Sequence, residues 1–370
     1  MALTGLGIPV ARVLAITGSW EQSVIRDTWY DGNVTPMKAG ILTRCSQSFL
    51  RFGSLELALK QNWTSSQNII SSALETTLIL TSQQTHYTSR VLASDSVKRK
   101  CFFAPSTKQW RKDYFIHKVA FDLASLIAAW MSVGFVHGSM NSDNISLIGE
   151  TIDLSVMNWI SRWNDSFTPS FVDIEGMYRF GNQNNVALDR LIELAALLGS
   201  TFRNSLFFKR YNLCFRERFK HRLGLGLLLL NKQQEDVIIH QFLQAATRVD
   251  FHELSLSLTT LAAFETSQQW MQFVKIQTGL PSFELLETLS AVIPTHMRVV
   301  WSSYVTSAVP NIVFRDDVAD QVIDDLISKR DFKKFATYAE NLKKPFENSS
   351  WKDFQSDFSK QTVQQSCGAQ

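Results

Sequence analysis

The stretch from Tyr114 to Phe135, YFIHKVAFDLASLIAAWMSVGF, constrains the fold of this 370-residue chain more than any other. Its apolar residues recur at intervals of three and four, which places them on one face of an α-helix. The face consists of Ile116, Val119, Leu123, Leu126, Ile127 and Trp130. Such a helix must be buried by other elements, and a chain of this length can supply a sizeable core in one to three domains.

A segment rich in polar residues follows this helix directly: GFVHGSMNSDNISLIGETIDLS, Gly134 to Ser155. Gly134 and Gly138 allow backbone conformations that end a helix. The letters ISLIG and ETIDL then predict two short strands joined by a Gly-Glu turn, which is a β-hairpin. We expect His137 to pack and to hydrogen-bond this loop.

The predicted hairpin would bring Asp153 back near Asn144. Amide and carboxylate oxygens suit Mg²⁺, which usually keeps waters and substrate phosphates as its other ligands, as in protein kinases. The neighbouring carboxylate of Asp143 could accept the proton of an attacking hydroxyl. Asp and Asn also form Asx-turns on their own account, so spacing alone leaves both interpretations open.

The rest of the chain divides into a strand-rich beginning, a helical body and a polar end. Two strand-like segments, PVARVLAIT and AGILTRCSQSF, precede a long region of helical periodicity. The last residues are polar and are expected to be loosely ordered. We predict an α+β, mainly helical fold with these parts: residues 1–54, strand-rich; 55–345, helical and containing the hairpin at 134–155; and 346–370, the tail.

Composition excludes several classes of function. The net charge is +3, with Lys and Arg scattered along the chain, so no nucleic-acid partner is expected. The most basic segment, residues 208–224, has the spacing of a solvated amphipathic helix. The first twenty residues lack the basic region of a signal peptide, and the longest uncharged run, 123–142, contains His and Asn, so no membrane insertion is expected. Four widely separated cysteines fit neither a zinc site nor a disulfide framework.

The polar segment resembles the catalytic segment of the selenoprotein O (SelO) family, which are protein adenylyltransferases with a protein-kinase-like fold. The family pattern is G-F-x-H-G-x-M-N-x-D-N-x-S-x-x-G-x-T-x-D-Y-G, and nearly every fixed position matches. The segments LGIPVARVLAI, RCSQSFLRFGSLE, DSFTPSFVDIEGMYRFGNQ and VPNIVFRDDVADQVIDDL also resemble the family, in the same order. The resemblance implies a kinase-like fold with an incomplete strand-rich N-lobe and a large helical C-lobe.

The resemblance assigns roles to five residues. Asp143 matches the proposed catalytic base, and Asn144 and Asp153 match the ligands of Mg²⁺ or Mn²⁺. Arg44 and Arg51 match the arginines that contact the phosphates of ATP bound in inverted orientation; the planar fork of Arg grips phosphate oxygens well. The implied reaction moves AMP from ATP to Ser, Thr or Tyr hydroxyls of protein substrates.

The chain departs from the family in its nucleotide-binding half. The family's glycine-rich loop, ATP-binding Lys and helix Glu lie upstream of the L-G-I-P segment, which here is Leu6–Pro9. These elements position the phosphates and stabilise charge in the transition state. We therefore expect this polypeptide to bind ATP weakly and to transfer little AMP.

Two further departures concern the residues after the metal-binding Asp and the C-terminal cysteine. The family's D-Y-G is Asp153–Ser155 here, and the missing Gly restricts the backbone after the Asp. The family's C-terminal redox pair is reduced to Cys367, because the position expected for its partner is Pro169. A regulatory disulfide is therefore not expected.

Two hypotheses follow. The chain is a protein adenylyltransferase, impaired unless the missing lobe comes from an upstream segment or another chain. Alternatively, it is a truncated, catalytically inactive pseudoenzyme whose helical body serves as a protein-interaction module. The presence of all five matched residues favours a recent truncation or an incomplete gene model over long decay, and the family's distribution implies a mitochondrial or cytoplasmic location.

Overall fold

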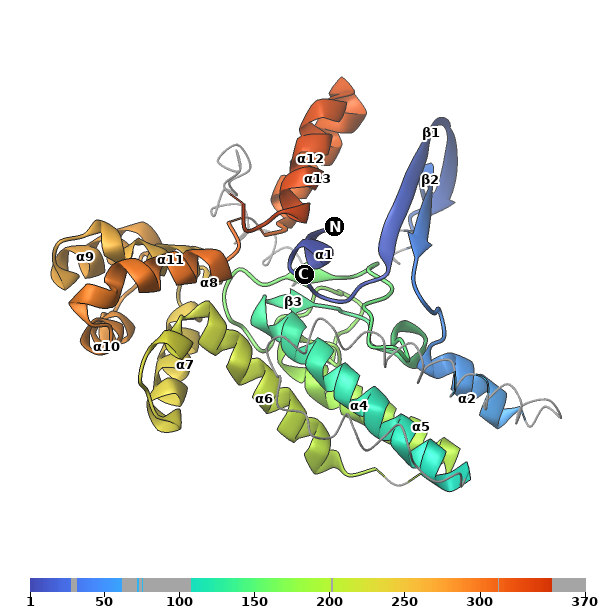
Figure 1. Ribbon diagram of the computed structural model, residues 1–370. Coiled ribbons are helices and arrows are strands. Elements are labelled where there is room, and N and C mark those ends of the chain that lie inside the picture. Colours follow the sequence, from blue (N-terminus) through green and yellow to red (C-terminus); the bar gives the residue numbers. More distant parts are fainter. Residues whose placement is uncertain are drawn as a thin grey trace.

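The computed structural model describes residues 1–27, 32–61, 72, 75, 108–200, 202–311 and 313–347. In these ranges the chain is mainly helical with two small antiparallel sheets, which confirms the predicted α+β class (Figure 1). The predicted polar tail, 346–370, lies outside the described residues except for its first two positions, and Cys367 lies outside them as well.

Helix α4, Lys108–Ser132, is the core helix that the periodicity predicted. All six residues of its predicted apolar face are at most 4% exposed. It packs against α5, Gln183–Leu198, and α6, Asn204–Arg222, and Figure 1 shows the three helices running alongside one another. Part of it, Lys112–Ser132, is long and apolar enough to span a membrane, but 78% of its most apolar window is buried inside the protein, as expected for a core helix.

A second helical group follows α6 and has its own apolar core around Trp270 and Trp301. The helical periodicity that the sequence shows in this region is confirmed. The group contains α7, Lys232–Ala246; α8, Phe251–Leu258; α9, Ser267–Thr278; α10, Glu284–Val292; and α11, Arg298–Ala308.

The C-terminal helical run is divided into two helices. The sequence pattern over residues 317–342 reads as uninterrupted, but α12 spans Asp316–Lys329 and α13 spans Phe332–Lys343. Arg330, between them, has a φ of 56°, and this left-handed conformation ends α12 as a C-cap residue does. The two helices lie side by side (Figure 1).

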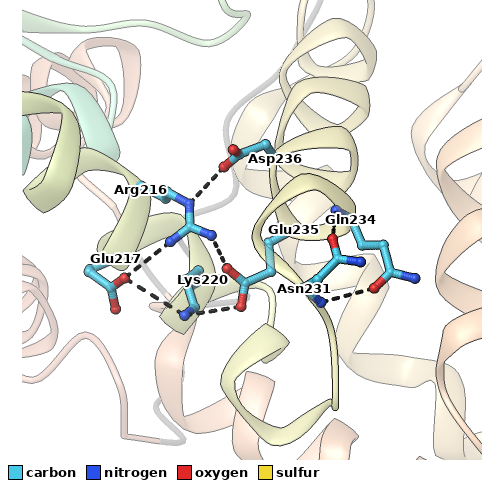
Figure 2. Close-up of polar contacts among 7 residues, drawn as sticks. All are labelled: Arg216, Glu217, Lys220, Asn231, Gln234, Glu235 and Asp236. Atoms are coloured by element: carbon cyan, nitrogen blue, oxygen red, sulfur yellow. Dashed lines mark hydrogen bonds and ion pairs between the residues drawn. The ribbon is translucent and has the colours of Figure 1, made fainter.

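The basic segment of α6 joins this helix to α7 through ion pairs (Figure 2). Arg216 Nε lies 2.7 Å from a carboxylate oxygen of Asp236, and the guanidinium also contacts Glu235. Lys220 Nζ lies 3.0 Å from the other oxygen of Glu235, whose side chain is 8% exposed. Arg216 and Lys220 stay 20% and 22% exposed, so this basic face is partly solvated and is neutralised by the acids of α7.

The strands predicted near the N-terminus are confirmed. β1, Arg12–Arg26, pairs with β2, Thr35–Cys45, as an antiparallel ribbon that projects from the helical body (Figure 1). Short helices flank the ribbon: α1, Ala2–Gly5, precedes it, and α2, Phe52–Lys60, follows it. The second sheet pairs two-residue strands, β3, Phe135–Val136, and β4, Asn158–Trp159.

Thr151 connects the N-terminal segment to the core. Its backbone N–H donates to Pro9 O over 2.8 Å, and its carbonyl accepts from Ala11 N over 3.0 Å. Its hydroxyl donates to Pro9 O over 2.7 Å and accepts from the indole Nε1 of Trp130 on α4 over 2.9 Å. Because Thr151 is 1% exposed, these bonds are shielded from water and fix the segment against the helix.

We predict that Thr151→Val lowers the free energy of unfolding by about 1–3 kcal/mol, because it leaves the buried indole N–H of Trp130 without a partner. Urea denaturation measures the loss. Thr337→Val is the control: Thr337 is a partly exposed residue of α13 whose hydroxyl donates to Lys333 O in a solvent-exposed bond, and its removal should change stability by less than about 0.5 kcal/mol. Equal losses in the two variants would contradict the connecting role of Thr151.

Candidate active site

The predicted hairpin exists, but its own pairing is reduced to one antiparallel bridge, Ile145 with Thr151. The reason is that each side also pairs with a distant segment. Ser146 bridges to Arg51, and Thr151 bridges to Val10. Four extended segments thus meet at the hairpin, and its two ends carry Asn144 and Asp153.

Gly138 lets the loop before the hairpin pack closely. Its φ is 78°, a conformation that favours glycine. A Cβ at this position would lie 2.4 Å from the carbonyl oxygen of Val156 and 2.7 Å from Pro169 Cγ. The loop therefore lies directly against the segment that follows Asp153.

His137 holds the far side of the hairpin, as the sequence led us to expect. Its ring is fully buried, and Nε2 donates to Ile152 O over 2.8 Å, while its backbone N–H donates to the side chain of Gln183 over 2.9 Å. Burial lowers the pKa of His137, so the ring is neutral near pH 7. The imidazole thus fixes the peptide immediately before Asp153.

Asp153 has a φ of 53°, which is uncommon for any residue but glycine and better tolerated by Asp than by most others. Its Oδ1 accepts from Ser155 N over 3.2 Å. This is the local turn that the alternative interpretation of the sequence expected. Within the described ranges no hydrogen bond involves Oδ2, so that oxygen can serve a ligand.

Asn144 ends the 3₁₀ turn Ser142–Asn144, which the side chain of Asn141 caps by accepting from Asp143 N over 3.0 Å. The Asn144 Nδ2 donates to the carbonyl of Ser139 over 2.9 Å and contacts its hydroxyl at 3.2 Å. These contacts fix which way the amide faces. In the described part of the chain Oδ1 has no hydrogen-bond partner and can coordinate a cation.

Asp143 is an exposed member of the loop, with 66% of its side chain accessible. Arg51 Nη1 donates to Asp143 O over 3.0 Å and lies 3.7 Å from Oδ1. Because the Arg51 side chain is itself 45% exposed, this pair adds little stability. Its effect is to hold a guanidinium beside the loop.

The two matched arginines differ in placement. Arg44 lies on β2 opposite Val13 and is exposed, and no hydrogen bond or ion pair among the described residues joins it to the loop. Sequence reasoning missed one contact. Ser46, which follows Arg44 in the sequence, donates from its Oγ to Glu150 at the turn of the hairpin over 2.6 Å. Nothing in the sequence marks this pair, which joins residues 104 positions apart.

The donor set fits a hard divalent cation only in part. In the ranges that the structure covers, no group of three or more His, Cys, Asp or Glu side chains is arranged to hold a metal. The site offers the oxygens of Asn144 and Asp153, one amide and one carboxylate. A Mg²⁺ ion there would depend on water and phosphate oxygens for its remaining ligands, which is its usual habit.

The model of a family described as "Protein adenylyltransferase SelO" matches residues 1–343. The chain belongs to the SelO family. The segments quoted above all lie in the matched range, so the resemblance seen in the sequence is confirmed.

Relatives of the SelO chain carry the name "Protein nucleotidyltransferase YdiU". That of Aromatoleum aromaticum is 35% identical over 202 residues, which are 54% of this chain and 34% of the relative. The Xanthomonas campestris protein is 31% identical over 277 residues, 72% of this chain and 48% of the relative. The Flavobacterium johnsoniae protein is 27% identical over 371 residues, 94% of this chain and 66% of the relative. The chain spans about a third to a half of the length of the first two.

We predict that His137→Phe lowers the free energy of unfolding at pH 7.5 by about 1–3 kcal/mol, because Ile152 O loses a buried partner. It should also flatten the pH dependence. The pKa of His137 is lowered by folding, so the unfolded chain takes up the proton first and stability falls as the pH drops through about 6.5. Between pH 7.5 and 5.5 the wild type should lose about 1 kcal/mol more than the variant. If urea denaturation shows that the wild type and the variant lose the same free energy of unfolding between pH 7.5 and 5.5, the neutral, buried state of His137 is contradicted.

Proposed function

We propose that this chain catalyses transfer of AMP from ATP to Ser, Thr or Tyr hydroxyls of proteins, using Mg²⁺ or Mn²⁺, on a kinase-like fold. The observation that carries the proposal is the hairpin bridge between Ile145 and Thr151. It holds the exposed carboxylate of Asp143 and the oxygens of Asn144 and Asp153 at the ends of one short hairpin. Membership of the SelO family supports AMP transfer as the type of chemistry.

Each residue of the site has a proposed role. Asp143 accepts the proton of the attacking hydroxyl, and its 66% exposure leaves it accessible to a protein substrate. Asn144 and Asp153 hold the cation through Oδ1 and the carboxylate. A divalent cation at such a site neutralises phosphate charge and orients the nucleotide.

Arg51 and Arg44 bind phosphate in this proposal. Arg51 already lies beside the loop, and its exposed contact with Asp143 is weak enough to be exchanged for a phosphate at small cost. Arg44 is assigned on its sequence match alone. Residues 1–54 then act as part of an N-lobe, and 55–345 act as the helical C-lobe.

A second candidate is a catalytically inactive interaction module. The ribbon β1–β2 favours it, because apolar side chains are more than half exposed on it. Two strands alone are marginally stable, and exposed apolar clusters commonly serve protein contacts. These side chains are Leu14, Ile16, Ile25, Ile41 and Leu42.

Labelling with α-³²P-ATP separates the two candidates. We predict Mg²⁺-dependent incorporation of label into the 370-residue polypeptide, because the hairpin keeps Asp143, Asn144 and Asp153 together. Asp143→Ala and Asp153→Ala should each reduce the rate at least about tenfold. Asp189→Ala, at an exposed position of α5, is the matched control and should keep the wild-type rate.

Three results would contradict the proposal. Label that survives Asp153→Ala would place the reaction elsewhere. Label transferred from γ-³²P-ATP instead of α-³²P-ATP would mean phosphoryl transfer. Absence of label, together with no Mg²⁺-ATP-dependent rise in melting temperature, would favour the interaction module.

A further inference from the structure

Gly53, the second residue of α2, makes room for the carboxylate of Asp143. A Cβ built on Gly53 would lie 2.4 Å from Asp143 Oδ1 and 3.1 Å from its Cγ. Real Cβ atoms do not approach other atoms so closely. The carboxylate therefore occupies the space that any other side chain at position 53 would take.

The backbone around Gly53 is held on both sides. Phe52 N donates to Ile145 O over 3.0 Å, which ties the start of α2 to the hairpin. Ser54 N donates to Arg51 O over 3.1 Å, and Arg51 N donates to Ser54 Oγ over 3.2 Å. A Cβ at position 53 would therefore displace the carboxylate, whose χ angles are free to turn, and not the helix.

The same turn attracts negative charge. The first turn of α2, a helix of nine residues, carries the positive end of the helix dipole. Arg51 Nη1 lies 3.7 Å from the same Oδ1. The Asp143 side chain is exposed and could otherwise rotate. The space at Gly53, the helix dipole and the Arg51 guanidinium together favour one position for its carboxylate.

We propose that Gly53 is a positioning residue, which keeps the Asp143 carboxylate against the first turn of α2. The meaning for catalysis rests on the proposed function, in which Asp143 is the base: a base must stay within hydrogen-bond reach of the hydroxyl it deprotonates. The contact itself, between residues 53 and 143, is independent of any activity.

A double-mutant cycle on the full chain tests the contact. In the Asp143→Ala background, Gly53→Ala should raise the melting temperature, because Ala favours a helix more than Gly does. With Asp143 present, the same substitution should raise it by at least about 2 °C less, or lower it, because the carboxylate must leave its place. Equal shifts in the two backgrounds would overturn the proposal.

The labelling assay tests the consequence. Gly53→Ala should lower the initial rate of AMP transfer about tenfold while the KM for ATP stays within about twofold, since only the base is misplaced. Gly226→Ala is the matched control, because a Cβ there meets nothing within 4 Å, and it should keep the wild-type rate. An unchanged rate in Gly53→Ala would overturn the positioning role.

The two assays separate the inference from the proposed function. Coupling in the melting cycle with no AMP transfer by the wild type would support the contact and contradict the proposed function. AMP transfer by the wild type with no coupling would support the function and overturn the inference.

Discussion

The hydrogen bonds of Thr151 are the constraint on which the rest of the structure depends. The hydroxyl of this buried residue accepts a hydrogen bond from the indole N–H of Trp130 on the core helix. The same residue forms hydrogen bonds to Pro9 and Ala11 of the N-terminal segment. The same residue forms the hairpin bridge with Ile145. Core, N-terminal segment and candidate catalytic loop are thereby fixed to one another by bonds that water does not reach.

In the candidate site, the residues that hold the loop in place differ from the residues proposed to act in catalysis. The supporting groups are buried and hydrogen-bonded, as His137 Nε2 is to Ile152 O, or are glycines such as Gly138, where backbone segments approach closely. The groups proposed to do chemistry, above all Asp143, face solvent and contribute little to stability. Substitutions in the first set should therefore lower the free energy of unfolding, whereas those in the second should mainly change activity.

Local patterns predicted local structure well. The apolar period of α4, the N-terminal strands and the hairpin turn follow from spacing of neighbouring residues, and all are present. The break at Arg330 was not predictable, because no glycine marks it. Contacts between distant segments were not predictable from spacing either: Arg51 reaches Asp143 across 92 positions, and the acids of α7 that neutralise Arg216 lie on another helix.

The central claim is that Asn144 and Asp153 hold a cation that carries a nucleotide. The most direct measurement is an anomalous difference map from crystals soaked in millimolar Mn²⁺ and ATP. The account predicts a peak at about 2.1–2.2 Å from Asn144 Oδ1 and a carboxylate oxygen of Asp153, close to the spacing of such hard cations, with phosphate oxygens as further ligands. A peak elsewhere in the protein, or Asp153 still bonded only to Ser155 N with no peak beside it, would contradict it.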